Sequence, residues 1–194
     1  MSATEIKVGG LGGQGVILAG MIVGRGASIC DGKYATMTQA FGPEARGSAC
    51  SAQVMVSDEP IEYPYVTRPD ILVVMSQEAF NRFAAELSPS GTLIYESDLV
   101  QPKDVPPTVT QYGIPCTRIA EELRHQMVAN IVMVGFIAAV TNVVTVDGLR
   151  ESVKTSVPTE TVSFNLTAFE RGYDFGMKLT GDAARSRTLV TSQA

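Results

Sequence analysis

Apolar residues along the chain gather into short runs that alternate with longer helical patterns. Residues 71–75, Ile-Leu-Val-Val-Met, form an uninterrupted apolar run, which is typical of a strand buried on both faces of a parallel sheet. Ser76 follows as a candidate N-cap, and Phe80 and Phe83 then recur at helical spacing. Another apolar run begins at residue 92. This order predicts a strand–helix–strand unit.

The same alternation extends along most of the chain. Strands are predicted at residues 6–8, 34–38, 51–57, 71–75, 92–95 and 109–112. Helical patterns occupy residues 15–30, the segment after Ser76, the segment around Ile119 and Leu123, residues 128–144, the segment that Asp147 is expected to cap, and residues 165–177. We therefore predict a Rossmann-like, layered α/β fold with a largely parallel sheet. Such sheets bind ligands beyond the carboxyl ends of their strands.

Length and composition predict one domain with a short tail. The chain has 194 residues, of which 45% are apolar and 18% are charged, and these values are typical of a single globular domain. We assign residues 1–180 to this domain. Residues 181–194 are small and polar in composition, so we expect them to form a disordered tail.

The run at residues 128–144 is apolar enough to raise the question of a membrane span. It is shorter than the about 20 residues that a span requires, and it contains Asn130 and Asn142. A helix buried on most sides fits better, either in the core or against another subunit. Because one small domain does not readily cover such a run, we expect it to mark an interface with larger partners.

Charge and cysteine content exclude several classes of function. The net charge is −5 and the basic residues do not cluster, which argues against a nucleic-acid surface. Cys30, Cys50 and Cys116 are widely separated and form no C-x-x-C pair, so the sequence indicates neither an iron–sulfur cluster nor another metal site in this chain. Their odd number and the lack of a signal peptide favour the reducing cytoplasm.

A glycine-rich loop follows the first predicted strand and precedes the first predicted helix. Gly10, Gly12 and Gly15 satisfy the G-x-G-x-x-G spacing, which permits a tight turn and a close approach of the backbone to a phosphate. The helix N-terminus that follows offers free N–H groups to an anion. Gly10, Gly12, Gly13, Gln14 and Gly15 are therefore candidate cofactor-binding residues. Two alternatives stay open: the glycines serve only strand–helix packing, and Gln14 bonds either a ligand or the loop backbone.

The loop does not belong to a familiar nucleotide-binding signature. A dinucleotide site needs an acidic residue at the end of its second strand, but residues 34–38 contain none and Asp31 precedes them. No Gly-Lys-Ser/Thr follows the loop. The single histidine, His125, lies among charged residues of a predicted helix, which is typical of a solvated surface position. We find no self-sufficient catalytic set and assign no catalytic residue.

A second motif completes a resemblance to a known family. Residues 38–48 read T-Q-A-F-G-P-E-A-R-G-S. Together with the glycine loop, they resemble the γ subunit of the 2-oxoacid:ferredoxin oxidoreductases, which share G-G-x-G-G-Q-G and G-P-E-x-R-G-G motifs. Further matches at residues 57–61, 69–77 and 165–172 extend the resemblance over about residues 5 to 178. Ser48 departs from the pattern, because the family has glycine there.

The resemblance implies an enzyme of several subunits. Such an enzyme decarboxylates a 2-oxoacid on thiamine diphosphate with magnesium, passes electrons through iron–sulfur clusters to ferredoxin, and releases an acyl-coenzyme A. The implied partners are α and β subunits and a ferredoxin-like δ subunit. The cofactors are implied to lie in those chains, so this chain is expected to be inactive alone and cytoplasmic, without nucleic acid or a membrane span. Overall similarity favours 2-oxoglutarate as the substrate.

The resemblance also implies that this subunit lies on the coenzyme A side of the enzyme. The glycine loop is then a candidate site for an anionic group of coenzyme A, and Glu44 and Arg46 are further candidates. An ion pair from Arg46 to Glu44 or Asp58 that only holds the loop is an equal alternative. The γ subunit of a pyruvate, branched-chain or indolepyruvate enzyme is the next hypothesis, followed by a stand-alone Rossmann-type nucleotide-binding oxidoreductase and a binding module without enzymatic activity.

Overall fold

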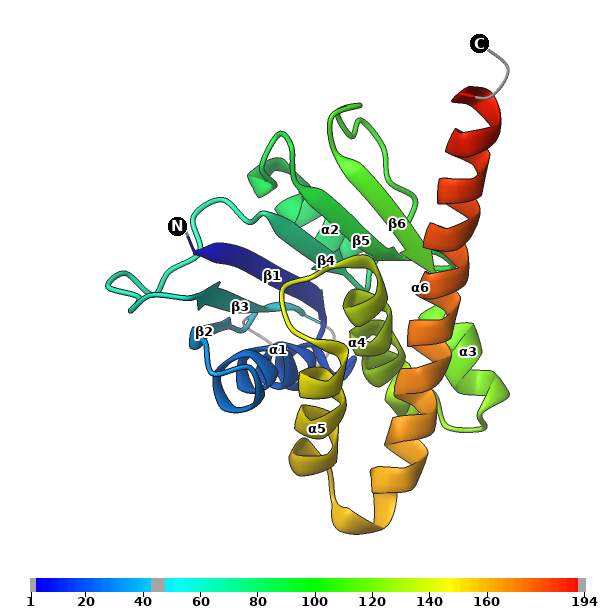
Figure 1. Ribbon diagram of the computed structural model, residues 1–194. Coiled ribbons are helices and arrows are strands. Elements are labelled where there is room, and N and C mark those ends of the chain that lie inside the picture. The colour runs from blue at the N-terminus through cyan, green and yellow to red at the C-terminus, as the bar shows by residue number, and fades with distance from the viewer. Residues whose placement is uncertain (1–2, 43–47, 192–194) are drawn as a thin grey trace.

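The chain is built on a six-stranded sheet with the strand order β2-β3-β1-β4-β5-β6 (Figure 1). The computed structural model describes residues 3–42 and 48–191. The strands are β1 (Thr4–Leu11), β2 (Tyr34–Ala40), β3 (Ala49–Ser57), β4 (Ile71–Val74), β5 (Thr92–Glu96) and β6 (Thr110–Ile114). β1, β4, β5 and β6 pair in parallel, whereas β3 is antiparallel to both of its neighbours, β1 and β2. The predicted mostly parallel sheet is confirmed.

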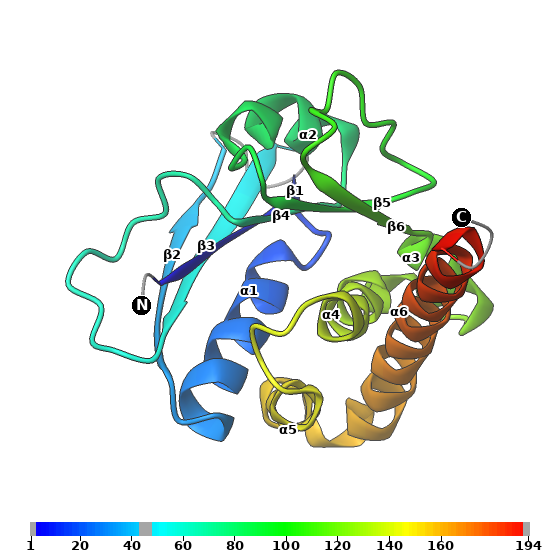
Figure 2. The ribbon, with the colours of Figure 1, turned by 45° about the horizontal axis from the view of Figure 1, so that its top comes forward.

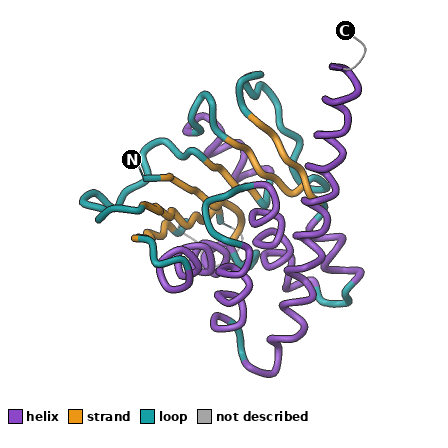
Figure 3. Tube along the Cα trace, viewed as in Figure 1, coloured by secondary structure: helices purple, strands orange, loops and turns teal. Residues whose placement is uncertain are grey.

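Helices cover the two faces of this sheet unequally. They are α1 (Val16–Arg25), α2 (Gln77–Phe83), α3 (Cys116–Glu122), α4 (Ala129–Val140), α5 (Val146–Ser156) and α6 (Val162–Thr191), with a π-helical turn (Gly26–Cys30) after α1. Short 3₁₀ turns occupy Ala84–Glu86, Gln126–Val128 and Thr159–Thr161. α1, α4, α5 and α6 lie on one side of the sheet and α2 on the other (Figure 2). Most helical residues therefore border a single face of the strand layer (Figure 3).

The order of the strands was not predictable from their order along the chain. β2 follows α1, yet β3 lies between β2 and β1 and pairs with both. In a dinucleotide-binding unit the strand after the first helix lies directly beside the first strand. Here an antiparallel hairpin takes that place. Ala52 on β3 packs against α1 at Gly20, where an added Cβ would reach the Ala52 methyl at 2.5 Å.

Helix starts follow the predicted chemistry in one case and not in another. The backbone N–H of Ala79 donates to Ser76 Oγ at 3.1 Å, so the predicted cap of α2 is confirmed. The predicted cap of α5 is wrong, because the N–H of Gly148 donates to Thr145 Oγ1 at 3.0 Å. Asp147 instead lies in the first turn of α5, where its negative charge interacts favourably with the positive end of the helix dipole.

α2 is attached to the second face through apolar contacts and one buried charge. Lys7 on β1 is 5% exposed and forms an ion pair with Glu86. Its Nζ also lies 4.8 Å from the centre of the Phe83 ring. A buried ammonium group needs such partners because desolvation is costly. The pair and the ring thus fix α2 over β1.

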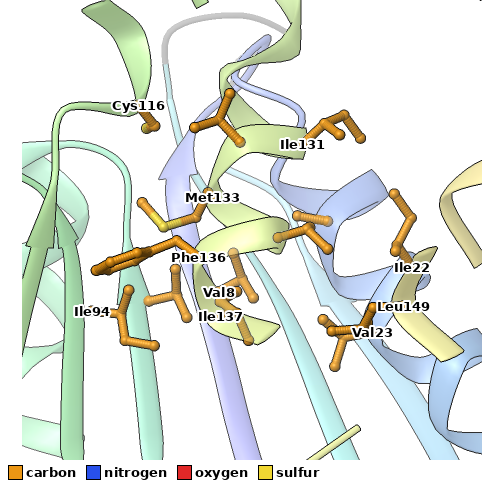
Figure 4. Packing of buried hydrophobic residues seen from close by; sticks show 14 of the residues in the cluster. Val8, Ile22, Val23, Ile94, Cys116, Ile131, Met133, Phe136, Ile137 and Leu149 are labelled. Atoms are coloured by element: carbon orange, nitrogen blue, oxygen red, sulfur yellow. The ribbon is translucent and has the colours of Figure 1, made fainter. Parts of the chain in front are cut away.

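α4 is the centre of the larger layer. All residues from Asn130 to Ile137 are buried, and the helix contacts α1, α3, α5 and α6. Figure 4 shows Met133, Phe136 and Ile137 of α4 among apolar side chains of the sheet and of neighbouring helices. Of the two alternatives for this run, burial in the core is confirmed for residues 130–137, and the expected interface with partners is wrong for them because the chain itself covers them. Among the described residues, no helix is both long enough and apolar enough to cross a membrane.

Two glycines allow α4 and α6 to cross at very short range. A Cβ at Gly135 on α4 would overlap the backbone carbonyl of Phe169, and a Cβ at Gly172 on α6 would overlap the carbonyl of Val132. Ala168 and Phe169 are completely buried at the same crossing. Helix packing thus explains Ala168, Phe169 and Gly172 in the family match at residues 165–172.

α6 continues further than the sequence indicated. It runs without interruption to Thr191 and projects past β6 (Figure 1). The segment from Gly181 to Thr191 is therefore helical, where we expected a disordered tail. Ala183, Ala184 and Leu189 are strong helix formers, which favours continuation once the preceding turns are fixed by α4.

Replacing Gly172 with alanine should destabilise the protein. The new methyl group has no space against the Val132 carbonyl, so the helices must separate, at a cost of about 1–3 kcal/mol or more. Urea unfolding followed by circular dichroism measures this loss. Gly181→Ala is the matched control on the same helix, because nothing lies within 4 Å of the position that its Cβ would take; we expect its stability to be unchanged or raised by up to about 1 kcal/mol. Equal stability of both variants would contradict the packing argument.

Candidate functional site

The glycine loop, residues 10–15, lies at the carboxyl end of β1, as the sequence predicted. Gly13 and Gly15 have φ angles of 102° and 73°, in the left-handed region that favours glycine. Gly15 is also the N-cap of α1, and no side chain caps that helix. At Gly10, a Cβ would lie 2.7 Å from Val16 Cγ2 and 2.8 Å from Gln14 Oε1. The loop conformation and its packing therefore both require glycine.

Gln14 holds the loop closed from within. Its Oε1 accepts the N–H of Leu11 at 2.7 Å, and its Nε2 donates to the carbonyl of Met75 at 2.9 Å. Both ends of the side-chain amide are thus used by backbone groups of β1 and of the residue after β4. Of the two roles left open for Gln14, the structure supports bonding to the backbone.

A buried asparagine supports the loop from α4. Asn130 is 3% exposed, and its Nδ2 donates to the carbonyl of Gly15 at 3.2 Å. A Cβ at Gly15 would overlap this amide. Within the described residues, the buried Asn130 Oδ1 has no hydrogen-bond partner. In the sequence, Asn130 stands out only as a polar residue in an apolar run, and that interruption was the signal of its structural role.

The two sequence motifs meet at one cavity. A cavity of about 610 Å³ is lined by Gly12, Gly13 and Gly15 of the loop and by Phe41, Gly42 and Ser48 of the second motif. The N–H of Gly12 donates to the carbonyl of Ser48 at 3.0 Å, so the motifs are in direct contact. Gly10 and Gln14 do not line the cavity. Glu44 and Arg46 lie outside the described residues.

One end of the cavity is formed by the backbone of the glycine loop and the start of α1, and its wall is formed by apolar side chains. Val16, Ile17, Leu18 and Phe41 supply the wall, and the first turn of α1 begins beside the loop without an acidic residue. Cys50 also lines the cavity, and burial raises the pKa of its thiol, which stays protonated at neutral pH. Free N–H groups at a helix N-terminus favour an anion. The site is therefore suited to a ligand with an anionic group and an apolar portion.

The single histidine of the chain lies away from the cavity. His125 is exposed, and its ring centre lies 4.3 Å from that of Phe164. It does not line the glycine-loop cavity. In the described part of the chain, no three histidine, cysteine or acidic side chains are grouped so as to hold a metal ion.

A buried polar cluster was missed at the level of sequence. Glu96 at the end of β5 is fully buried and accepts hydrogen bonds from Cys116 Sγ at 2.7 Å and from the Thr117 N–H at 2.7 Å. The Asp98 N–H and the Thr117 hydroxyl also donate to this carboxyl. Burial and the adjacent Glu96 raise the pKa of the Cys116 thiol well above its ordinary value. The cluster joins β5 to α3; an acidic residue directly after a buried strand was the signal for it.

Comparisons with known proteins agree on one family. The pyruvate ferredoxin/flavodoxin oxidoreductase family model matches residues 5–175. The 2-oxoglutarate synthase subunit KorC of Methanocaldococcus jannaschii is 45% identical over 177 residues, which span 90% of this chain and 95% of the relative.

Solved structures share the fold. The γ subunit of a keto/oxoacid ferredoxin oxidoreductase from Geobacter sulfurreducens is 34% identical with a TM-score of 0.78, over 90% of this chain and 99% of that one. The 2-oxoglutarate:ferredoxin oxidoreductase from Magnetococcus marinus, solved with 2-oxoglutarate, coenzyme A and succinyl-CoA, is 24% identical with a TM-score of 0.82. There the fold spans 91% of this chain but 31% of the other.

The three thiols should differ sharply in reactivity. Cys30 is exposed, whereas Cys50 and Cys116 are buried and have raised pKa values, so they form little thiolate near pH 8. A colorimetric disulfide reagent should therefore label one thiol quickly in the native protein and all three after denaturation. Cys30→Ser should abolish the fast phase. Rapid labelling of Cys116 in the folded chain would contradict its buried hydrogen bond to Glu96.

Proposed function

The chain belongs to the pyruvate ferredoxin/flavodoxin oxidoreductase family, and we propose that it is the γ subunit of a 2-oxoglutarate:ferredoxin oxidoreductase. The observation that carries this proposal is the 45% identity to a 2-oxoglutarate synthase subunit over nearly the full length of both chains. The complex converts the 2-oxoacid to an acyl-coenzyme A and passes the electrons to ferredoxin. A cytoplasmic location is part of the proposal.

The described residues of this chain fit a supporting role in that reaction. They offer no metal-binding group and no acid–base pair at the cavity, so we assign thiamine diphosphate, magnesium and the iron–sulfur clusters to other subunits. We propose α and β subunits and a ferredoxin-like δ subunit as partners. In the Magnetococcus marinus enzyme this fold is about a third of a longer chain, which supports a close association with a second polypeptide.

We propose that the glycine-loop cavity binds part of coenzyme A. Coenzyme A supplies the thiol that accepts the acyl group. The N–H groups at the start of α1 would bind an anionic group of this ligand, and the wall formed by Ile17, Leu18 and Phe41 would exclude water from its less polar portion. Glu44 and Arg46 are included in this proposal because they belong to the second sequence motif. Gly42 and Ser48, on either side of them in the chain, line the same cavity.

A stand-alone dinucleotide-binding oxidoreductase receives no support from the fold. Such an enzyme holds the ribose of its cofactor with an acidic residue at the end of the strand beside β1. Here β3 occupies that place and runs in the opposite direction. Residues of β3 that pair with the end of β1 are Ala49, Cys50 and Ser51, and none is acidic.

Purification of the tagged chain from its native cell should recover thiamine- and cluster-binding subunits. The chain produced alone should be colourless and inactive, because its described residues provide no cluster ligands. Adding it to the other subunits should restore formation of succinyl-coenzyme A from 2-oxoglutarate. Equal coenzyme A-dependent activity with and without this chain would refute a role for it in the enzyme.

Variants of the two motifs test the coenzyme A site in the assembled complex. Gly12→Val fills part of the cavity, and Arg46→Ala removes a candidate anion contact. Both should weaken the apparent affinity for coenzyme A. For Arg46→Ala we expect a loss of about tenfold to a hundredfold, because one charge-assisted hydrogen bond contributes roughly 1.5–3 kcal/mol. Decarboxylation, which precedes the entry of coenzyme A, should be largely retained.

Complex integrity and coenzyme A saturation must be measured on the same preparations. Lys178→Ala on α6, at an exposed position away from the cavity, is the control and should leave both unchanged. If both half-reactions fail together because the complex dissociates, the motifs serve assembly. Unchanged coenzyme A affinity in an intact complex would refute the proposed site.

A further inference from the structure

A second large cavity lies on the α2 side of the molecule and shares no lining residue with the glycine-loop cavity. It is a groove of about 640 Å³ between α2, the turn that follows it, and the proline-rich connection from β5 to β6. Its apolar lining includes Phe80, Ala84, Leu87, Val105, Pro106 and Val109. We call it the α2 groove. The proposed enzymatic function makes no use of it.

The wall of the α2 groove is held in place at both ends. The N–H of Gln101 donates to Gln77 Oε1 at 2.8 Å, which fixes the start of the proline-rich connection to α2. At the other end of the proline-rich connection, Thr108 Oγ1 donates to the carbonyl of Pro89. Between them, Asp104 adopts a φ of 54°, an uncommon conformation for a residue other than glycine. The groove is therefore preformed, which lowers the entropic cost of filling it.

The rim of the groove is basic on an otherwise acidic chain. Arg68 and Lys103 line it, and neither forms an ion pair with any described residue. Asp104 is the carboxylate on the same rim. The chain as a whole has a net charge of −5. An apolar floor with two basic side chains at its edge fits a segment that carries both carboxylates and large apolar side chains.

This chain presents such a segment in the same connection that carries Arg68. The β3–β4 connection extends past the end of β3 (Figure 1), and its residues 58–65 read D-E-P-I-E-Y-P-Y. We call these residues the acidic loop. Tyr63 and Tyr65 are 61% and 55% exposed, and their ring centres lie 5.4 Å apart. Exposed tyrosines are typical anchors of protein interfaces.

The acidic loop is ordered by contacts at its two ends. At its start, the N–H of Glu59 donates to Ser57 Oγ at 3.0 Å. Just beyond its end, the Glu5 carboxylate accepts the N–H groups of Thr67 and Arg68 at 2.8 and 2.9 Å. Arg68 therefore belongs both to this connection and to the rim of the α2 groove.

We propose that two copies of this chain form a two-fold dimer in which the acidic loop of each copy lies in the α2 groove of the other. Glu62 would face the basic rim, and Tyr63 and Tyr65 would cover the apolar floor. A surface that contains both a segment and its complement can pair with its own copy and close after two chains. This association is independent of the proposed enzymatic function.

Charge reversal tests the dimer in the purified full-length chain. Sedimentation velocity over a dilution series should show a reversible monomer–dimer equilibrium. Lys103→Glu and Glu62→Lys should each weaken dimerisation about tenfold or more, because each places like charges opposite one another. The double variant, Lys103→Glu with Glu62→Lys, should recover most of the lost affinity. Lys178→Glu, an exposed cation outside the groove, is the matched control and should have no effect.

Several results would overturn this proposal. A wild-type chain that stays monomeric throughout the series would do so, as would a dimer that none of the charge reversals weakens. Native mass spectrometry of the purified enzyme complex provides a second measurement. We expect an even number of copies of this chain in each complex. A single copy would contradict the dimer, because no second acidic loop would then be present to fill the α2 groove.

Discussion

The close packing of α4 supports both the core and the glycine-loop cavity. Its middle turns are wholly buried, and Gly135 and Gly172 let it approach the backbone of α6 directly. Where two backbones are in direct contact, no side chain can change its conformation to accommodate a displacement of the helix. The position of α4 is therefore strongly fixed. At its N-terminal end, the same helix carries Asn130 to the carbonyl of Gly15. The packing that completes the core thus also sets the conformation of the loop at the start of α1.

The cavity owes its shape to backbone geometry more than to reactive side chains. Left-handed glycines turn the chain from β1 into α1, and Gln14 fastens that turn to the end of β4. The antiparallel hairpin of β2 and β3 then brings Ser48 against Gly12. A dinucleotide-binding sheet could not do this, because its second strand would lie where β3 lies. The unusual strand order is therefore what joins the two family motifs into one site.

Buried polar groups in this chain fasten elements to one another. Lys7 pairs with Glu86 to hold α2 on β1, and Glu96 gathers the donors that attach α3 to β5. Ser152 similarly donates to the carbonyl of Ile22 at 2.8 Å and links α5 to α1. Each group has partners that offset the cost of its burial. These contacts fix the positions of α2, α3 and α5 relative to the sheet and to α1.

The sequence by itself determined the local features. Apolar runs located the strands, because burial on both faces requires continuous hydrophobicity, and Ser76 marked a helix start because its hydroxyl bonds within the next turn. The glycine spacing identified the loop, since its requirements are local backbone angles and close approach. The motifs also sufficed to identify the family. Tertiary structure decided which distant elements meet: β3 between β1 and β2, Asn130 against Gly15, and α6 over α4. It also decided that the apolar run of α4 is covered within the chain, because coverage depends on neighbours that periodicity along one segment cannot specify.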